Sequence, residues 1–298
     1  MIDPTFTSAE DLARFEIFPA GSIETQAAEL PRQAHITITC SPKHGPDHSV
    51  EAAGRLRDLG HTVTVHVAAR MVRDRSHLDA LLAAMKDAGA DDLFLVAGDI
   101  EDQLGEYASA VELLPILAEH PQRPPTIGIT GYPEDHPFIS DEDLEQALLD
   151  KCRDADYITT QMCFDPDTLR DWVVRHRERG LTLPVVIGMP GKVKRKRLLT
   201  MSAQIGVGPS MRFLRKQRGL LSLLSRRSTA DRLYDAFAPM LDDPDLKLAG
   251  FNYYTFNQLL GTWEWHQKKL EASGKRSQQR KESVHDTEQP AGASGPVG

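Results

Sequence analysis

The feature that most constrains this chain is an alternation of short apolar runs with segments of helical length and period. The clearest run, LFLVA at 93–97, follows a turn signal and leads through Gly98 into a lone carboxylate, Asp99. Continuous apolar runs of this length predict buried parallel strands. The eight predicted strands are 14–19, 35–40, 62–67, 93–97, 126–131, 157–162, 184–189 and 248–255.

Helices are predicted between most of these strands, and several open on a Ser or Asp cap. Eight strands alternating with helices over 298 residues predict an α/β fold, a closed parallel (β/α)8 barrel. An open doubly wound sheet is the alternative, because periodicity alone does not show closure. The predicted helices are 22–30, 48–60, 76–89, 106–120, 140–154 and 165–180.

The domain organisation is predicted as one catalytic barrel, residues 1–272, followed by a disordered C-terminal tail, residues 273–298. The tail is polar and rich in Pro, Gly and Ser, with almost no large apolar residues to bury. Two or three extra helices are expected between strands seven and eight, at 192–240. This insert is a natural place for a substrate lid.

Composition excludes several classes of protein. A net charge of −8 argues against a nucleic-acid binder, although basic runs at 192–197 and 212–219 form either a solvated helix face or a docking surface for a polyanionic tail. The sequence has no membrane-spanning apolar run and no signal peptide, so we expect a cytoplasmic protein without a membrane partner. The three cysteines are too scattered for a disulfide framework. Assembly into a homo-oligomer stays open.

Polar residues at the carboxyl ends of barrel strands are the candidates for chemistry. Glu16 lies in an apolar setting that should raise its pKa and make it a proton donor near neutral pH. Asp99, if ionised, would stabilise developing positive charge. The alternative for either acid is a helix cap or an ion pair. The other strand-end residues are Thr39, His66, Tyr132, Gln161 and Tyr254.

Metal and nucleotide motifs are weak or missing. The loop clusters HGPDH (44–48) and YPEDHP (132–137) contain His, Asp and Glu, but neither has a recognised ligand spacing, and we predict no metal. The chain has no P-loop and no G-x-G-x-x-G fingerprint. Any dinucleotide must therefore be held by barrel loops.

An ordered series of motifs resembles one family. FEIFP is similar to the FEFFPP that opens the methylenetetrahydrofolate reductase family, and LVAGD is similar to its LRGD. GEYASA, GYPEDHP, ITTQMCFD, GMPG and FNYYTFN resemble later landmarks in the same order, over about residues 14–260. The resemblance implies a flavoprotein barrel that binds FAD, uses NADH or NADPH, and interconverts 5,10-methylenetetrahydrofolate and 5-methyltetrahydrofolate by hydride transfer.

The resemblance also implies roles for individual residues. Glu16 matches the general acid that protonates the bridging nitrogen of the folate, and Asp99 matches the acid beside flavin and pterin. Gln161 matches a pterin-binding glutamine, and Tyr254 falls at the substrate end. The positions that match FAD contacts are Thr39, His66, Gly98, Asp99, Tyr107, Ala108, Tyr132, His136 and Lys151.

Several positions depart from the family pattern. Ala97 replaces the arginine of LRGD, and Leu144 and Ala147 stand about where an Asp and an Asn contact FAD. Cys40 replaces an aromatic residue, and Gln258 replaces the arginine for the folate tail. These departures keep open a flavin-independent reductase and a pterin-binding methyltransferase-type barrel, and they leave the reaction direction undecided. A non-catalytic partner barrel is disfavoured because the three folate-contacting positions are retained.

Overall fold

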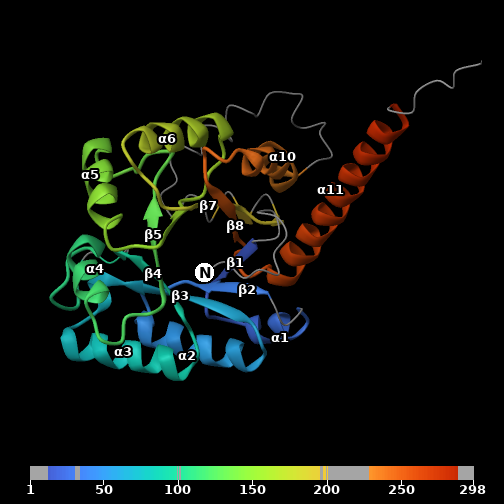
Figure 1. The fold of residues 1–298 in the computed structure, drawn as a ribbon. Coiled ribbons are helices and arrows are strands. Elements are labelled where there is room, and N and C mark those ends of the chain that lie inside the picture. Colours follow the sequence, from blue (N-terminus) through green and yellow to red (C-terminus); the bar gives the residue numbers. More distant parts are fainter. Residues whose placement is uncertain are drawn as a thin grey trace, which may run out of the picture.

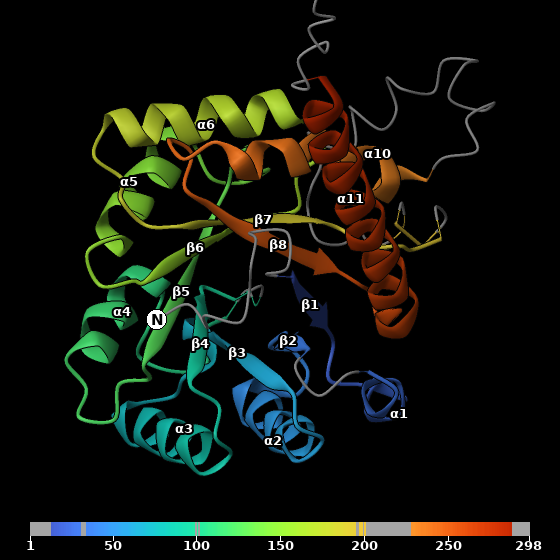
Figure 2. The same ribbon diagram turned by 45° about the vertical axis from the view of Figure 1, so that its right-hand side comes forward.

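A computed structural model describes residues 13–30, 34–98, 100, 102–194, 197, 198, 200 and 228–287, with the side chains of the last helix described to residue 273. Its eight strands form a closed parallel barrel in sequence order, in which β1 pairs with β8. The helices surround the strands (Figures 1 and 2). The predicted (β/α)8 barrel is confirmed, and closure excludes the open doubly wound sheet. The strands are β1 (Ala13–Ile17), β2 (His35–Ile38), β3 (Thr62–Ala68), β4 (Asp92–Val96), β5 (Thr126–Gly131), β6 (Tyr157–Thr160), β7 (Val185–Pro190) and β8 (Leu248–Tyr254).

Five of the described helices begin at a side chain that accepts a hydrogen bond from the first turn, as capping rules predict. Ser109 caps the fourth helix, which begins at Ala110 instead of residue 106 and leaves Tyr107 and Ala108 in the loop after β4. Ser140 and Asp165 cap the next two helices in the same way. The helices between strands are α1 (Ile23–Ala28), α2 (Gly45–Asp58), η2 (Ala69–Met71), α3 (Arg75–Asp87), α4 (Ala110–Ala118), α5 (Asp141–Lys151) and α6 (Pro166–Glu178).

The insert between β7 and β8 is described only at its ends, because residues 201–227 lie outside the described residues. Its later part contains α10 (Thr229–Phe237) and η3 (Ala238–Asp242), and a capping box at Ser228 starts α10. The last helix, α11 (Leu259–Thr287), continues past the barrel (Figure 1) and past residue 273. The disordered tail stays a prediction, since side chains beyond 273 are not described. None of the described helices is long and apolar enough to cross a membrane.

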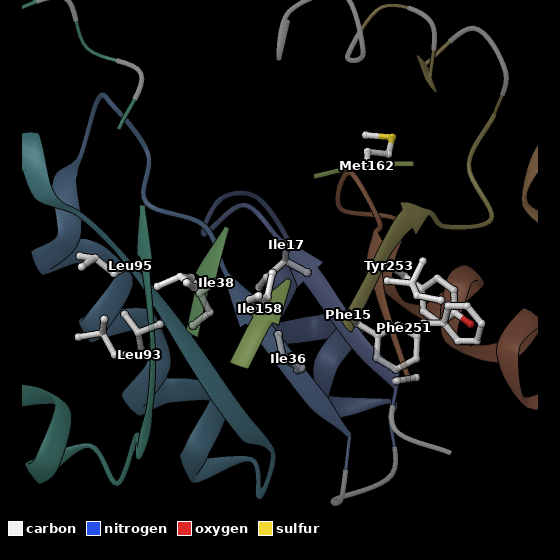
Figure 3. Packing of buried hydrophobic residues seen from close by; sticks show 14 of the residues in the cluster. Phe15, Ile17, Ile36, Ile38, Leu93, Leu95, Ile158, Met162, Phe251 and Tyr253 are labelled. Atoms are coloured by element: carbon white, nitrogen blue, oxygen red, sulfur yellow. The ribbon is translucent and has the colours of Figure 1, made fainter. Parts of the chain in front are cut away.

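The apolar core lies between the outer face of the barrel and the helices. Phe15 and Ile17 of β1 and Ile36 of β2 are at most 2% exposed (Figure 3). The ring of Phe15 packs 5.6 Å from that of Tyr253 on β8. Because strand side chains alternate between faces, these outward positions place Arg14 and Glu16 on the inner face of β1.

The interior of the barrel contains a buried polar cluster near the amino ends of the strands, which we call the Arg14–Asp92 layer. Arg14 Nη1 lies 3.4 Å from Asp92 Oδ2, and the Tyr157 hydroxyl donates to Asp92 Oδ1 over 3.0 Å. Thr64 donates to the same carboxylate over 2.6 Å. The guanidinium of Arg14 also lies 4.1 Å from the centre of the Tyr157 ring. These residues belong to β1, β3, β4 and β6, so they meet inside the barrel.

A glycine makes room for this layer. A Cβ atom at Gly128 on β5 would lie 2.2 Å from the Tyr157 ring, which is closer than any side chain tolerates. Gly128 therefore lets the Tyr157 ring lie flat against β5 and reach Asp92.

We predict that Arg14→Met lowers the free energy of unfolding by about 3–5 kcal/mol, because Asp92 then stays buried without its counter-charge. The matched control is Arg170→Met, which removes an exposed partner of Asp243 at 3.2 Å and should cost less than about 1 kcal/mol. Urea unfolding followed by circular dichroism measures both. Equal losses in the two variants would contradict a stabilising role for the Arg14–Asp92 layer.

Candidate active site

The polar surface continues from the Arg14–Asp92 layer towards the carboxyl ends of the strands. With a side-chain period of two, Glu16 follows Arg14 on β1, and His66 follows Thr64 on β3, both on the inner face. Thr37 of β2 pairs in register with Glu16. The strand pattern therefore directs Glu16 and His66, two of the predicted site residues, into the upper half of the barrel.

Glu16 is a partly buried carboxyl at this level of the barrel. Burial raises its pKa from an ordinary 4.5 to about 7, and a hydrogen bond from Asn252 opposes the shift. Asn252 Nδ2 donates to Glu16 Oε2 over 3.0 Å. Glu16 can therefore hold a proton at neutral pH. After the proton leaves, the hydrogen bond from Asn252 stabilises the carboxylate.

The backbone around Glu16 is fixed by the segment that follows β8. The Thr255 hydroxyl donates to the Glu16 carbonyl over 2.6 Å. Asn257 donates to the carbonyls of Phe18 and Ala20, and it accepts from the Phe18 N–H. Sequence reasoning missed Asn252 and Asn257 as site residues, although both lie in the FNYYTFN motif.

His66 and Tyr254 are two further residues at inward-facing positions of their strands. Burial, followed by the charge of Arg14, lowers the pKa of His66 to about 3, so its imidazole is neutral at physiological pH. Its ring packs 4.7 Å from that of Phe94. The Tyr254 hydroxyl donates to the Thr160 carbonyl over 3.3 Å, and burial, followed by the negative charge of Glu16, raises its pKa well above the usual value.

Two polar atoms at the mouth lack a hydrogen-bond partner among the residues that the structure describes. They are Thr39 Oγ1, just after β2, and Gln258 Nε2, just after β8, and both atoms are buried. A buried polar atom without a partner costs free energy, so such atoms favour a ligand that supplies the bond. Both residues follow a barrel strand, at the carboxyl end of the barrel.

The end of β4 requires a glycine for its backbone conformation and for packing against Ala68. Gly98 has φ of +101°, and a Cβ there would lie 3.0 Å from Ala68 Cβ and 3.9 Å from Arg70 Cβ. Arg70 donates its backbone N–H to the Ala97 carbonyl over 3.0 Å. The backbone of Arg70, just after β3, thus lies beside Ala97, the position where the resemblance places an arginine. Asp99 lies outside the described residues.

Some predicted cofactor contacts already have partners within the chain. Lys151 Nζ donates to the Thr130 carbonyl over 3.1 Å, and burial lowers its pKa to about 8. The Ala108 N–H donates to Glu112 over 3.0 Å at the start of α4. Tyr107 is buried in the same loop. The Lys151 ammonium and the Ala108 N–H therefore already have hydrogen-bond partners within the chain.

The loop after β5 carries Tyr132 and His136, whose rings meet edge to face with centres 5.3 Å apart. Tyr132 also lines a pocket of about 430 Å³ between α5 and α6, together with Leu144 and Trp172. Tyr132, a predicted contact, and Leu144, one of the departures from the family pattern, thus share one cavity.

Gln161, the predicted folate contact, follows β6. Its Oε1 accepts from the Met162 N–H over 2.7 Å.

The acids of the two clusters considered for metal binding serve the fold. Glu134 accepts from the backbone N–H groups of Phe164 and Asp165 and thereby joins the loops after β5 and β6. Asp47 lies 3.1 Å from His77 Nε2. Within the described ranges, no group of three or more His, Cys, Asp or Glu side chains has a metal-binding arrangement.

The basic run after β7 is partly engaged as well. Lys192 Nζ lies 2.8 Å from Asp231 and 3.0 Å from the Ser228 hydroxyl, which attaches the end of β7 to the start of α10. Arg195 and Lys196 lie outside the described residues. Lys192 is therefore part of a structural contact, and the docking surface stays a prediction.

Comparison with known proteins decides the family. The pattern of the methylenetetrahydrofolate reductase family matches residues 24–204, which is more than half of the chain. The chain belongs to this family. The match includes the landmarks from β2 to the segment after β7, and β1 with Glu16 lies just before it.

The alignments with individual relatives cover shorter segments of the chain. Methylenetetrahydrofolate reductase 1 of Schizosaccharomyces pombe is 29% identical over 124 residues, which are 38% of this chain and 20% of that protein. Methylenetetrahydrofolate reductase 2 of Saccharomyces cerevisiae is 37% identical over 67 residues, which are 21% of this chain and 11% of that protein. The matched segments thus span only a fraction of the length of these family members.

One solved structure shares the fold. An uncharacterized protein from Clostridium thermocellum, which binds two copies of 5-methyl-5,6,7,8-tetrahydrofolic acid, aligns with a TM-score of 0.58 and 13% identity. The alignment covers 82% of this chain and 88% of that chain. At this identity the likeness shows a common barrel fold and no more.

We predict that Glu16→Gln stabilises the protein at high pH. Folded Glu16 holds its proton more tightly than the unfolded chain, so wild-type stability falls as pH rises from 4.5 to about 7. The amide does not ionise, and the variant should gain about 2–3 kcal/mol over wild type by about pH 8. Urea unfolding at about pH 5 and about pH 8 measures the difference. A difference that does not change with pH would contradict the raised pKa.

Proposed function

We propose that this chain interconverts 5,10-methylenetetrahydrofolate and 5-methyltetrahydrofolate by FAD-dependent hydride transfer, with Glu16 as general acid. The observation that carries the proposal is a carboxyl with a pKa of about 7 inside the mouth of a barrel of this family. The folate-binding neighbour from Clostridium thermocellum supports a folate as substrate.

The proposed role of Glu16 is proton transfer. Reduction of the methylene group requires a proton on the bridging nitrogen, so that the ring opens to an iminium before hydride reaches the carbon. Glu16 supplies that proton near neutral pH, and the amide of Asn252 stabilises the carboxylate that remains. In the same proposal Gln161 and Tyr254 bind the folate, and the charge of Asp99 favours the iminium.

The mouth fits a cofactor with several polar groups. When bound, FAD supplies hydride transfer between NADH or NADPH and the folate. The buried Thr39 Oγ1 without a described partner would bind one of its polar atoms, and Gly98 is proposed as a further contact. Arg70 would supply positive charge beside Ala97. The remaining proposed contacts are His66, Asp99, Tyr107, Ala108, Tyr132, His136 and Lys151.

A second candidate is a flavin-independent reductase that passes hydride directly from a nicotinamide cofactor to the same folate. The internal bonds of Lys151 to Thr130 and of Ala108 to Glu112 favour it, because these groups are less available to FAD. Leu144 supports it further, since an apolar side chain stands about where the resemblance places a carboxylate for FAD. The absorbance spectrum of the purified protein discriminates the two candidates.

We predict that apoprotein binds FAD noncovalently and reversibly. Titration should show saturable quenching of flavin fluorescence, with weaker affinity than for family members that keep the arginine at the position of Ala97. A control titration with heat-denatured protein should show no quenching. If the native protein shows no saturable binding at any practical FAD concentration, the flavin-independent reductase becomes the preferred function.

We predict that Glu16→Gln separates the two half-reactions. The variant should fold, bind FAD and still be reduced by NADH or NADPH, whereas its folate half-reaction should slow by about 10²–10⁴-fold. Asp99→Asn should slow both halves because its charge lies near flavin and pterin in the proposed site. Stopped-flow absorbance of each half-reaction measures these rates. An undiminished folate half-reaction in Glu16→Gln would remove Glu16 from the mechanism.

A further inference from the structure

The carboxyl of Glu16 is held from one side by a chain of two buried side chains. Asn252 on β8 is 2% exposed and donates to Glu16 Oε2 over 3.0 Å. Thr37 on β2 is 3% exposed, and its hydroxyl donates to Asn252 Oδ1 over 3.4 Å. The three residues come from β8, β1 and β2, which are consecutive in the barrel.

The Thr37 hydroxyl and the Glu16 carboxylate together hold the Asn252 amide in one direction, because the hydroxyl donates to Oδ1 and a carboxylate can only accept. With Oδ1 accepting from Thr37, the amide N–H groups face Glu16. The reversed amide would put Oδ1 against Oε2, and two acceptors meet favourably only if a proton lies between them. The direction of the amide thus controls where the proton of the neutral acid sits.

We propose that Asn252, oriented by Thr37, is a positioning residue that keeps Oε2 of Glu16 as acceptor and places the transferable proton on Oε1. This inference rests on the proposed role of Glu16 as general acid. In a neutral carboxyl the carbonyl oxygen is a stronger acceptor than the hydroxyl oxygen, so a donor at Oε2 favours the hydroxyl at Oε1. The proton is then directed away from β8 and is available for transfer. After transfer, Oε2 keeps its donor.

The titratable groups around Glu16 do not provide an alternative switch. Tyr254 on β8 keeps its proton far above neutral pH, because burial and the charge of Glu16 raise its pKa. His66 on β3 is neutral, since its pKa is about 3. Arg14, earlier on β1, is paired with Asp92. β2 contributes Thr37, which does not titrate, and Asp99 after β4 lies outside the described residues.

Two variants of Thr37 test the inference. Thr37→Val has nearly the same shape but cannot hold the amide, so Asn252 can reverse and the proton can move to Oε2. We expect the maximal rate of the folate half-reaction to fall by about 10-fold, with a much smaller change in the Michaelis constant for the folate. Thr37→Ser keeps the hydroxyl and should retain the wild-type pH midpoint. Thermal unfolding of both variants checks that they fold.

Asn252→Leu tests the same contact through titration. Loss of the donated hydrogen bond destabilises the carboxylate, so the alkaline limb of the pH–rate profile should move to higher pH while the maximal rate falls. A residue that only supports the fold would lower the rate without moving the midpoint. The infrared carboxyl band that is absent in Glu16→Gln reports the titration of Glu16 directly, without folate or flavin.

The outcomes separate this inference from the proposed function. If Glu16→Gln retains the folate half-reaction, the general-acid assignment fails. If Glu16→Gln is inactive while Thr37→Val and Asn252→Leu keep both the wild-type profile and the wild-type carboxyl titration, Glu16 remains the acid and the positioning role of Asn252 is overturned. A shifted carboxyl titration in Asn252→Leu, with a lower rate, supports the inference.

Discussion

The ion pair between Arg14 and Asp92 inside the barrel is the interaction on which the candidate site at the carboxyl ends of the strands depends. A charge inside a barrel is costly unless it is paired and hydrogen-bonded, and Asp92 meets this condition through Arg14, Thr64 and Tyr157. The pair places Arg14 on the inner face of β1, and the period of two then places Glu16 on the same face. It also helps to keep His66 neutral through the charge of Arg14. The Arg14–Asp92 layer, at the amino ends of the strands, thus influences the site at their carboxyl ends.

The properties of Glu16 follow from two opposed effects. Burial favours the neutral acid, whereas the hydrogen bond from Asn252 favours the carboxylate. A proton donor needs both, because it must carry a proton at neutral pH and remain stable after giving it up. Both effects depend on barrel closure, since Asn252 comes from the last strand and Glu16 from the first. The pKa of Glu16 therefore depends on the pairing of the first strand with the last.

The opposite part of the mouth shows how a family member can change its contacts and keep its barrel. The resemblance places an arginine where this chain has Ala97, and the backbone of Arg70 after β3 bonds to Ala97. The resemblance places a carboxylate and an amide about where the fifth helix has Leu144 and Ala147, and Leu144 lines a pocket. Loops tolerate such exchanges because their side chains contribute little to the core. The strands that carry Glu16 and His66 are more constrained, because the same residues build the barrel interior.

The sequence by itself determined the eight strands, their order and the position of the candidate acid at the end of the first strand. These follow from local properties: apolar runs, a side-chain period of two, and capping residues such as Ser140 and Asp165, which the structure shows at helix starts. Even the boundary error at α4 had a local cause, since Ser109 was available as a cap. The family resemblance added roles for residues at strand ends, and those roles remain proposals.

Only the tertiary structure decided closure and the partners of each polar side chain. Asn252 is more than two hundred residues from Glu16 in sequence, and Asn257 is similarly far from Phe18, so no local pattern could pair them. The same holds for Lys192 with Asp231 and for Arg14 with Tyr157. A residue's type and face are encoded locally, whereas its hydrogen-bond partner and its pKa depend on which distant strand closure brings beside it.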